Sequence, residues 1–175
     1  MSNQEQTNEH IEPLVNMLES TDSKVRRKAR KSLVALGKPA VSALSSALQH
    51  SRVYKVRWEA AKALGAIGDA KAIPSLITAL EDPETDVAWL AAKALEKFGK
   101  AVWPKLLRTL IKRGSDSVLL RHGAHHVLRN QRAAGYNDLL EALKKALESE
   151  TVPESTALAA LNILKRMGER PEQDL

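Results

Sequence analysis

Three of the five histidines lie within five residues of one another, and histidine is the side chain best suited to metal and acid–base chemistry near neutral pH. On a helix, His122 and His126 share one face and could hold a metal ion. A catalytic metal site also needs a third protein ligand and an open position, and Asp116, the nearest acid in sequence, precedes the predicted helix. We therefore predict no metal site here, and expect His122 and His126 to be surface imidazoles.

Other catalytic arrangements are missing from the sequence. There is no cysteine, which excludes disulfides, thiol catalysis and cysteine-based zinc sites. No glycine-rich phosphate loop, Ser-His-Asp set or pair of carboxylates stands at a spacing typical of an active site. We assign no catalytic residue and no cofactor, and expect a binding module rather than an enzyme.

Two tryptophans are each followed, four residues later, by a lysine: Trp58 by Lys62 and Trp89 by Lys93. On a helix each pair shares one face. Exposed tryptophan is typical of surfaces where binding energy is concentrated, and a neighbouring lysine adds a cation–π contact of about 0.5–1 kcal/mol. The alternative is that each tryptophan packs against the next element and the lysine only solvates it.

These pairs belong to a repeat with a period of 31 residues. The recurring positions are Val25, Val56 and Val87; Ala29, Ala60 and Ala91; Leu33, Leu64 and Leu95; and Gly37, Gly68 and Gly99. The unit from Ala72 to Gly99 has two apolar stripes at helical spacing, separated by the breaker Glu81–Glu84 and closed by a glycine C-cap. Each unit is therefore predicted to be two antiparallel helices, and the units must stack to bury their stripes.

The sequence predicts an all-α fold, a right-handed α-solenoid of about five helix pairs. We expect one domain over residues 9–168, with frayed ends at 1–8 and 169–175. The fourth unit fits only with a two-residue insertion, and Trp103, which aligns with Ile73, is expected to fill the core. Aromatic residues make up only 3% of the chain, and its 43% hydrophobic content is mainly Ala and Leu, which favours close-packed helices.

Stacking would align equivalent residues of the second helices into two columns. We call Arg27, Trp58, Trp89 and His122 the Trp column, and Lys31, Lys62, Lys93 and His126 the Lys column. Together with Lys28, these residues form the predicted binding ridge. Glu59 is expected to lie in the ridge as well.

The pattern Val-Arg-x-x-Ala-Ala-x-Ala-Leu-Gly-x-Ile-Gly-Asp at Val56–Asp69 resembles HEAT repeats of the phycobilisome-lyase type. The resemblance is strong over residues 25–110, fair over 11–24 and weak over 111–170. It implies a curved solenoid whose second helices line the concave face, which usually binds another macromolecule. The resemblance also implies that Arg26 and Arg57 have a structural role. In this role an aspartate, such as Asp22, would link to the arginine and join a turn to a helix.

Basic residues are concentrated near the predicted ridge. Residues 23–58 contain ten Lys or Arg and no acid, within a net charge of +6. Such a surface attracts acidic partners, although a charge run is also typical of a solvated helix face. No apolar run is long enough to span a membrane, and the first residues lack a signal-peptide core, so we expect a soluble cytoplasmic protein with no membrane partner.

Three functions are weighed. The first is a non-enzymatic scaffold or adaptor whose ridge binds an acidic protein or peptide. The second is nucleic-acid binding, possibly resembling HEAT-like DNA glycosylases; Glu59, as a ridge acid, would repel phosphate, and Asp86 is expected to cap a helix. The third is a bilin-lyase-like subunit. A resemblance to deoxyhypusine hydroxylase is not supported because the chain has no His-Glu dipeptide. The oligomeric state is left open.

Overall fold

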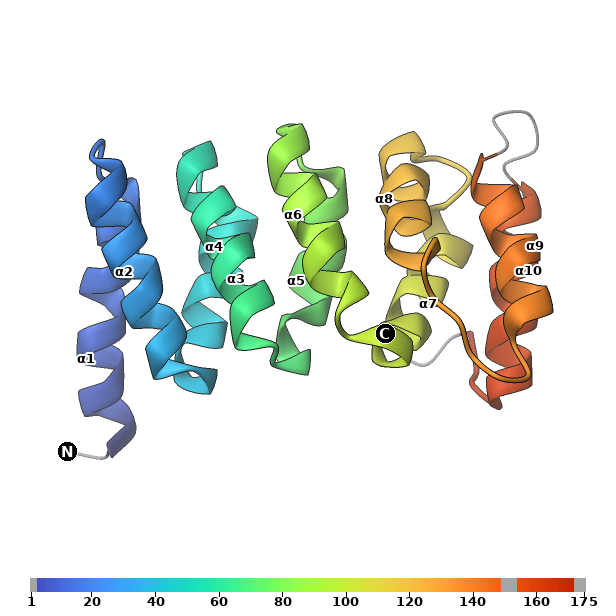
Figure 1. The fold of residues 1–175 in the computed structure, drawn as a ribbon, viewed down its shortest axis with the longest axis horizontal. Helices are drawn as coiled ribbons and strands as arrows, with labels where there is room; N and C mark the ends of the chain where they lie inside the picture. Colours follow the sequence, from blue (N-terminus) through green and yellow to red (C-terminus); the bar gives the residue numbers. More distant parts are fainter. Residues whose placement is uncertain (1–2, 149–153, 172–175) are drawn as a thin grey trace. The chain divides into compact units, whose positions relative to one another are not determined.

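Each repeat of the sequence folds as a pair of helices in the computed structural model, which describes residues 3–148 and 154–171 (Figure 1). These residues form ten α-helices and five short 3-10 helices, and contain no strand. The predicted all-α solenoid of five helix pairs is therefore confirmed.

The helices are divided between two compact units, Met1–Lys97 and Phe98–Leu175. The first unit contains α1 (Asn3–Asn16), α2 (Ser23–Leu36), α3 (Val41–His50), α4 (Tyr54–Ile67), α5 (Ile73–Thr78) and α6 (Thr85–Glu96). The second contains α7 (Trp103–Arg113), α8 (Val118–Leu128), α9 (Asn137–Glu148) and α10 (Glu154–Met167). A single domain over residues 9–168 stays a prediction.

Short 3-10 helices lead into or end several of the α-helices. They are η1 (Met17–Glu19), η2 (Lys38–Ala40), η3 (Ala70–Ala72), η4 (Ala79–Glu81) and η5 (Gly99–Val102). At the N-terminus, α1 begins at Asn3, ahead of residue 9. At the other end, Glu169 accepts a hydrogen bond from Arg108 on α7 at 2.6 Å. The remainder of the ends predicted to fray, residues 1–2 and 172–175, lies outside the described residues.

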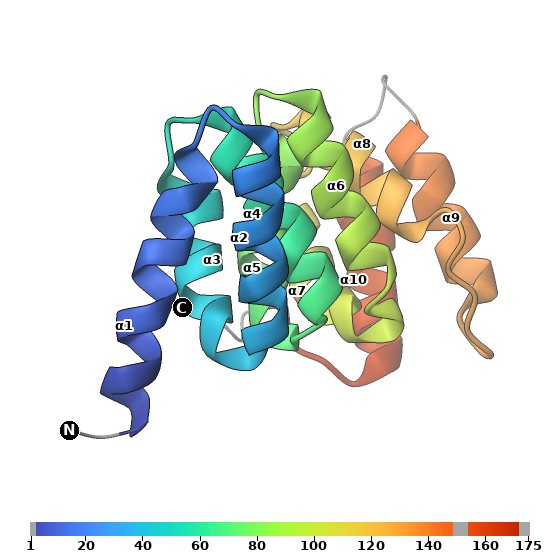
Figure 2. The same cartoon turned by 60° about the vertical axis from the view of Figure 1, so that its left-hand side comes forward.

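The first unit has two layers of helices. Figures 1 and 2 both show α2, α4 and α6 side by side, with α1, α3 and α5 forming the other layer. Helix α4 packs against both α2 and α6, and α3 packs against both α1 and α5. The predicted repeat positions Leu33, Leu64 and Leu95 are fully buried between the layers. Alanines at the equivalent positions 29, 60 and 91 are also fully buried, and their small side chains let neighbouring helices approach closely.

Two glycines of the predicted column end the second helices as expected. Gly37 caps α2 with φ of 69°, and Gly68 caps α4 with φ of 70°. Both values lie in the left-handed region that glycine adopts without the steric cost of a Cβ. At the other end of α2, Asp22 accepts a hydrogen bond from the backbone N–H of Lys24 at 2.8 Å and caps the helix.

Arginines at equivalent repeat positions tie three of the second helices, α2, α4 and α8, to the turn before each of them. Arg26 donates to the carbonyl of Ser20 at 2.7 Å, Arg57 to that of Ser51 at 3.0 Å, and Arg121 to that of Gly114 at 2.7 Å. The predicted structural role of Arg26 and Arg57 therefore holds, with backbone carbonyls as the shared acceptors.

The predicted Asp–Arg link joins adjacent repeats. Arg57 binds Asp82 with two hydrogen bonds, of 2.7 and 2.9 Å. These bonds hold the pKa of Arg57 above its ordinary value. Asp22 differs from the prediction because it caps α2 while Arg26 binds the turn carbonyls.

In the second unit the two helices of the last pair pack in the reverse order. Helix α9 packs on α8, and α10 packs on α7, whereas in the first unit second helices pack on second helices. The helix at 154–167, predicted as the second of its pair, therefore lies in the layer of α7. Trp103 is 1% exposed and meets the ring of Tyr136 edge-on at 5.7 Å, so its predicted place in the core is confirmed.

Candidate functional site

Within the first unit, the two predicted columns lie on adjacent helices. Helices α2, α4 and α6 carry Arg27, Trp58 and Trp89, and one helical turn further along they carry Lys31, Lys62 and Lys93. Because α4 packs against both of its neighbours, each column crosses three packed helices (Figure 2). The repeat thus places Arg27 and two tryptophans in one line across these helices, and three lysines in a second line one helical turn further along.

Both predicted Trp–Lys pairs are in contact. The Nζ atom of Lys62 lies 4.4 Å from the ring centroid of Trp58, and that of Lys93 lies 5.8 Å from the centroid of Trp89. A cation at such a distance is attracted by the electron-rich face of the ring. Each ammonium group is therefore positioned by a ring on its own helix.

The two tryptophans differ in exposure. Trp89 is 53% exposed, whereas Trp58 is half-buried. The alternative prediction, that each tryptophan packs against the next element, therefore applies in part to Trp58 and hardly to Trp89. Arg27, Lys28, Lys31 and Lys62 are exposed, and Lys93 is half-buried with its Nζ 3.8 Å from Glu96.

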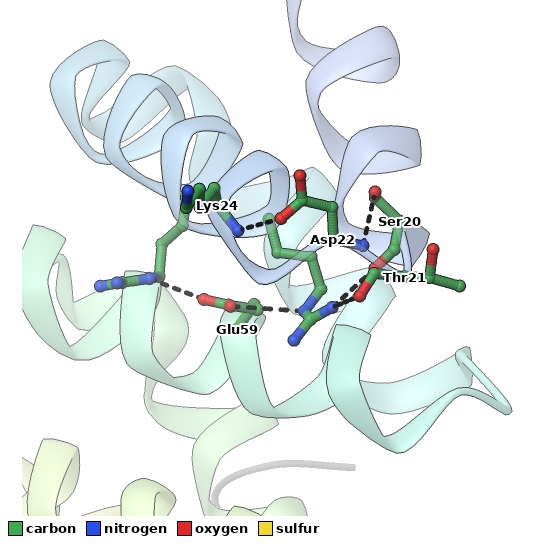
Figure 3. Close-up of polar contacts among 7 residues, drawn as sticks. Ser20, Thr21, Asp22, Lys24 and Glu59 are labelled. Atoms are coloured by element: carbon green, nitrogen blue, oxygen red, sulfur yellow. Dashed lines mark hydrogen bonds and ion pairs between the residues drawn. The ribbon is translucent and has the colours of Figure 1, made fainter.

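Glu59 is buried, not part of the exposed ridge as predicted. It is 4% exposed and points into the contact between α2 and α4, where Arg30 Nε donates to its Oε2 at 2.7 Å (Figure 3). Arg26 Nε lies 3.8 Å from the other carboxylate oxygen. Two arginines therefore neutralise this acid from the neighbouring repeat. The argument that Glu59 repels phosphate from the face does not hold.

Tyr54 is an aromatic residue of this face that the sequence analysis did not select. It is 45% exposed at the start of α4, one helical turn before Trp58, and Lys55 Nζ lies 6.0 Å from its ring centroid. The spacing of four residues from Trp58 was the available signal. Asp86 lies in the first turn of α6, where its charge favours the helix dipole, but it is not the N-cap residue as expected; Glu84 is.

The predicted ridge residues His122 and His126 belong to the second unit, on α8. His122 is exposed and His126 is half-buried. Their neighbour His125 lies with Nε2 3.0 Å from Oε1 of Glu148 on α9. Among the described residues, no group of three or more His, Cys, Asp or Glu side chains is placed to hold a metal ion.

The stacked helix pairs of residues 41–129 match a family model described as HEAT repeats. The matched segment is slightly more than half of the 175 residues. This chain belongs to the HEAT-repeat family. HEAT repeats commonly serve as scaffolds for protein interaction, and a solenoid of this kind is typically not an enzyme.

Comparison with curated proteins gives no match. Among solved structures, the HEAT-repeat chain is similar to an engineered protein from the Northeast Structural Genomics Consortium. The two are 23% identical with a TM-score of 0.46, over 91% of this chain and 85% of the engineered one. Within the described residues, no helix has both the length and the apolar character needed to cross a membrane.

Proposed function

We propose that this HEAT-repeat protein is a non-enzymatic binding module, and that the face formed by α2, α4 and α6 binds an acidic segment of a partner protein. The observation that carries the proposal is the pairing of Lys62 with Trp58 at 4.4 Å, repeated by Lys93 with Trp89. Held over a ring, an ammonium group keeps donors free for a carboxylate, while the exposed edge of the ring offers apolar contact.

The charge of the face supports an acidic ligand. Arg27, Lys28, Lys31 and Lys62 are all exposed. Glu59 adds no exposed negative charge because Arg26 and Arg30 neutralise it in the helix contact. A positive surface of this kind raises the local concentration of acidic segments and speeds their encounter.

The same contacts favour carboxylates over single-stranded nucleic acid. Nucleic-acid grooves of this type stack successive bases on open aromatic faces. Trp58 is half-buried and carries Lys62 on its ring, so little of its face is left for stacking. Nucleic-acid binding, a glycosylase-like activity and a bilin-lyase-like role are the competing functions.

The finer assignments rest on sequence pattern. We infer that the repeats are of the phycobilisome-lyase type from the complete consensus at Val56–Asp69. A binding role for His122 and His126, which belong to the second unit, stays a prediction. The cytoplasmic location stays a prediction.

The experiment compares two labelled polyanions, a ten-residue oligoglutamate and a ten-nucleotide oligothymidylate, by fluorescence anisotropy at several salt concentrations. We expect tighter binding of oligoglutamate at equal ionic strength. Replacing Lys31, Lys62 and Lys93 together by Gln should weaken it at least about tenfold, since each removes a charged contact.

A triple variant of equal charge provides the matched control: Lys38→Gln, Lys71→Gln and Lys145→Gln, all exposed and outside the columns. Both triple variants share the effect of a lower net charge. Once that shared effect is subtracted, the control variant should change the affinity for oligoglutamate by less than about twofold. Equal losses in both triple variants would show general charge attraction and contradict the proposed face. Tighter binding of oligothymidylate with a steep salt dependence would instead establish nucleic-acid binding.

A further inference from the structure

The three helices of the candidate face differ in charge at equivalent repeat positions. Four positions of each second helix lie on one side of it, because they are three, four or seven residues apart. On α2 these positions hold Lys24, Arg27, Lys28 and Lys31, and all four side chains are exposed. Helix α2 therefore presents only cations to a ligand at these positions.

Helix α4 presents fewer charges at the same four positions. Lys55 and Lys62 are exposed, but the other two positions hold the half-buried Trp58 and the buried Glu59, whose charge is balanced by Arg30. The ammonium of Lys62 covers part of the Trp58 ring, at 4.4 Å from its centroid. Helix α4 is therefore cationic, with a ring that is only partly open to a ligand.

Helix α6 has no net charge at these positions and has the most open ring. Asp86 is an exposed acid, and the Nζ atom of Lys93 lies 3.8 Å from the carboxylate of Glu96 on the same helix. The remaining positions hold Trp89, which is 53% exposed, and the half-buried Leu90. Because an acid on α6 balances its lysine, this helix offers a ligand apolar surface rather than positive charge.

The order of the helices makes these differences directional. Helix α4 packs between α2 and α6, so the face changes from cationic at α2 to apolar at α6 (Figure 2). We propose that the ligand of this face has two parts: consecutive acidic residues that lie over α2 and α4, and a large apolar side chain beyond one end of them that packs on Trp89. This proposal rests on the proposed function and specifies its ligand. Lys31 and Lys62 then bind carboxylates, and Lys93 contributes little.

The face discriminates against the opposite placement of such a ligand. Acidic residues over α6 would bring their carboxylates near Asp86 and Glu96, and like charges at an interface are unfavourable. An apolar side chain over α2 would cover Arg27 and Lys28 and remove them from water without a partner, which is also costly. One orientation of the ligand therefore avoids both costs.

The test uses the full chain and three peptides that carry a fluorescent label at the same end. The first peptide has four glutamates, a linker of six alternating glycines and serines, and then Phe-Leu. The second peptide replaces Phe-Leu by Ser-Ser, and the third replaces the glutamates by glutamines. We expect the first peptide to bind at least about fivefold more tightly than the second, and the third to bind most weakly. Anisotropy measures the three affinities.

Two double variants that lose the same charge locate the acidic part. Lys28→Gln with Lys31→Gln removes two cations of α2 and should weaken the first peptide at least about fivefold. Lys93→Gln with Lys97→Gln removes two cations of α6 and should weaken it less than about twofold. Lys97 is a suitable partner in this control because it is exposed and its Nζ donates to the carbonyl of Gly65 at 3.4 Å.

A substitution at Trp89 locates the apolar part. Trp89→Ala should weaken the first peptide about fivefold and leave the second nearly unchanged, because only the first has a side chain that packs on the ring. Binding of the first peptide should also shift the tryptophan emission to shorter wavelength, and Trp89→Phe should remove this shift. Circular dichroism checks the fold, which is expected to be intact because Trp89 is on the surface.

The outcomes separate the two proposals. If the first two peptides bind equally and both double variants weaken them equally, the acidic ligand of the proposed function holds and the two-part ligand is wrong. A larger loss for the α6 double variant than for the α2 double variant overturns the proposed orientation. If neither peptide with glutamates binds, both the proposed function and its ligand are wrong.

Discussion

Arg30 of α2 donates a hydrogen bond of 2.7 Å through Nε to Oε2 of Glu59 on α4, and the Glu59 side chain is only 5% exposed. The acid that lies nearest the basic face in sequence is thus turned into the contact between repeats. Its charge is balanced there by Arg30 and, at 3.8 Å, by Arg26. One interaction therefore joins two repeats and leaves the outer face positive.

Removing the Glu59 carboxylate should destabilise the first unit. Glu59→Ala leaves Arg30 without its acceptor in a contact where its side chain is only 16% exposed. We expect a loss of about 1.5–3 kcal/mol in the free energy of unfolding, the range for hydrogen bonds to charged groups. Denaturant unfolding measures it. Glu12→Ala, at an exposed position of α1, is the control and should change the free energy by less than about 0.5 kcal/mol. A Glu59→Ala effect as small as this control would contradict the structural role.

The bidentate pair between Arg57 and Asp82 should require the planar guanidinium group of arginine. Arg57 makes two hydrogen bonds to Asp82 and a third to the carbonyl of Ser51, which a lysine cannot reproduce. Arg57→Lys is expected to cost about 1–3 kcal/mol of unfolding free energy because the bidentate pair is lost. A double-mutant cycle with Asp82→Asn measures the coupling. Additive effects of the two substitutions would show that the pair contributes nothing beyond its separate contacts.

The repeat made most of the fold predictable. A glycine and a leucine recurring every 31 residues indicated both the helix ends and the buried layer, since stacked units repeat their contacts. The reversed order of α9 and α10 was not predictable, because both helices are amphipathic and either could pack on α8. The weaker repeat pattern beyond residue 111 gave no column of residues that distinguishes the two arrangements.

Contacts of the candidate face that lie within one helix could be predicted from the sequence, whereas contacts between two helices were harder to predict. Trp58 and Lys62 meet because they are four residues apart on α4. Glu59 was misplaced because its partner Arg30 is 29 residues away, on the neighbouring repeat. Residues one apart on a helix point in directions about 100° apart, so Glu59 and Trp58 face different surroundings.

The ion pair of Asp138 and Arg166 should make stability fall at acid pH. A hydrogen bond from Arg166 holds the pKa of Asp138 below its ordinary value. Its contribution is therefore complete above the pKa of the unfolded chain, about 3.9, and is lost as pH falls through the lower pKa of the folded state. The melting temperature of Asp138→Asn should lie below that of the parent at pH 7, and the difference should shrink below pH about 4. Arg166→Gln should show the same pH dependence; a difference that persists unchanged at low pH would exclude this ion pair as its cause.

Iodide should quench mainly the fluorescence of Trp89. Trp89 is 53% exposed and Lys93 Nζ lies 5.8 Å from its ring, whereas Trp103 is 1% exposed. A nearby cation concentrates iodide, so Trp89→Phe should remove most of the iodide-quenchable emission and Trp103→Phe little of it. Lys93→Gln should lower quenching by iodide but not by neutral acrylamide. Equal iodide quenching in the parent and Trp89→Phe would contradict the exposure of this ring.

Gly65→Ala should destabilise the contact between α4 and α6. The added Cβ would lie 2.8 Å from the Cβ of Ala94, and the nearest backbone atom of Ala94 at 3.4 Å leaves little room for either helix to shift. We expect a loss of about 1–3 kcal/mol in unfolding free energy, as for other overpacked contacts, although alanine favours a helix over glycine by about 1 kcal/mol. Ala94→Gly removes the opposing methyl, so the double variant should recover part of the loss. If Gly65→Ala raises the denaturation midpoint instead, the helix preference outweighs the clash and α4 and α6 lie further apart than this contact requires.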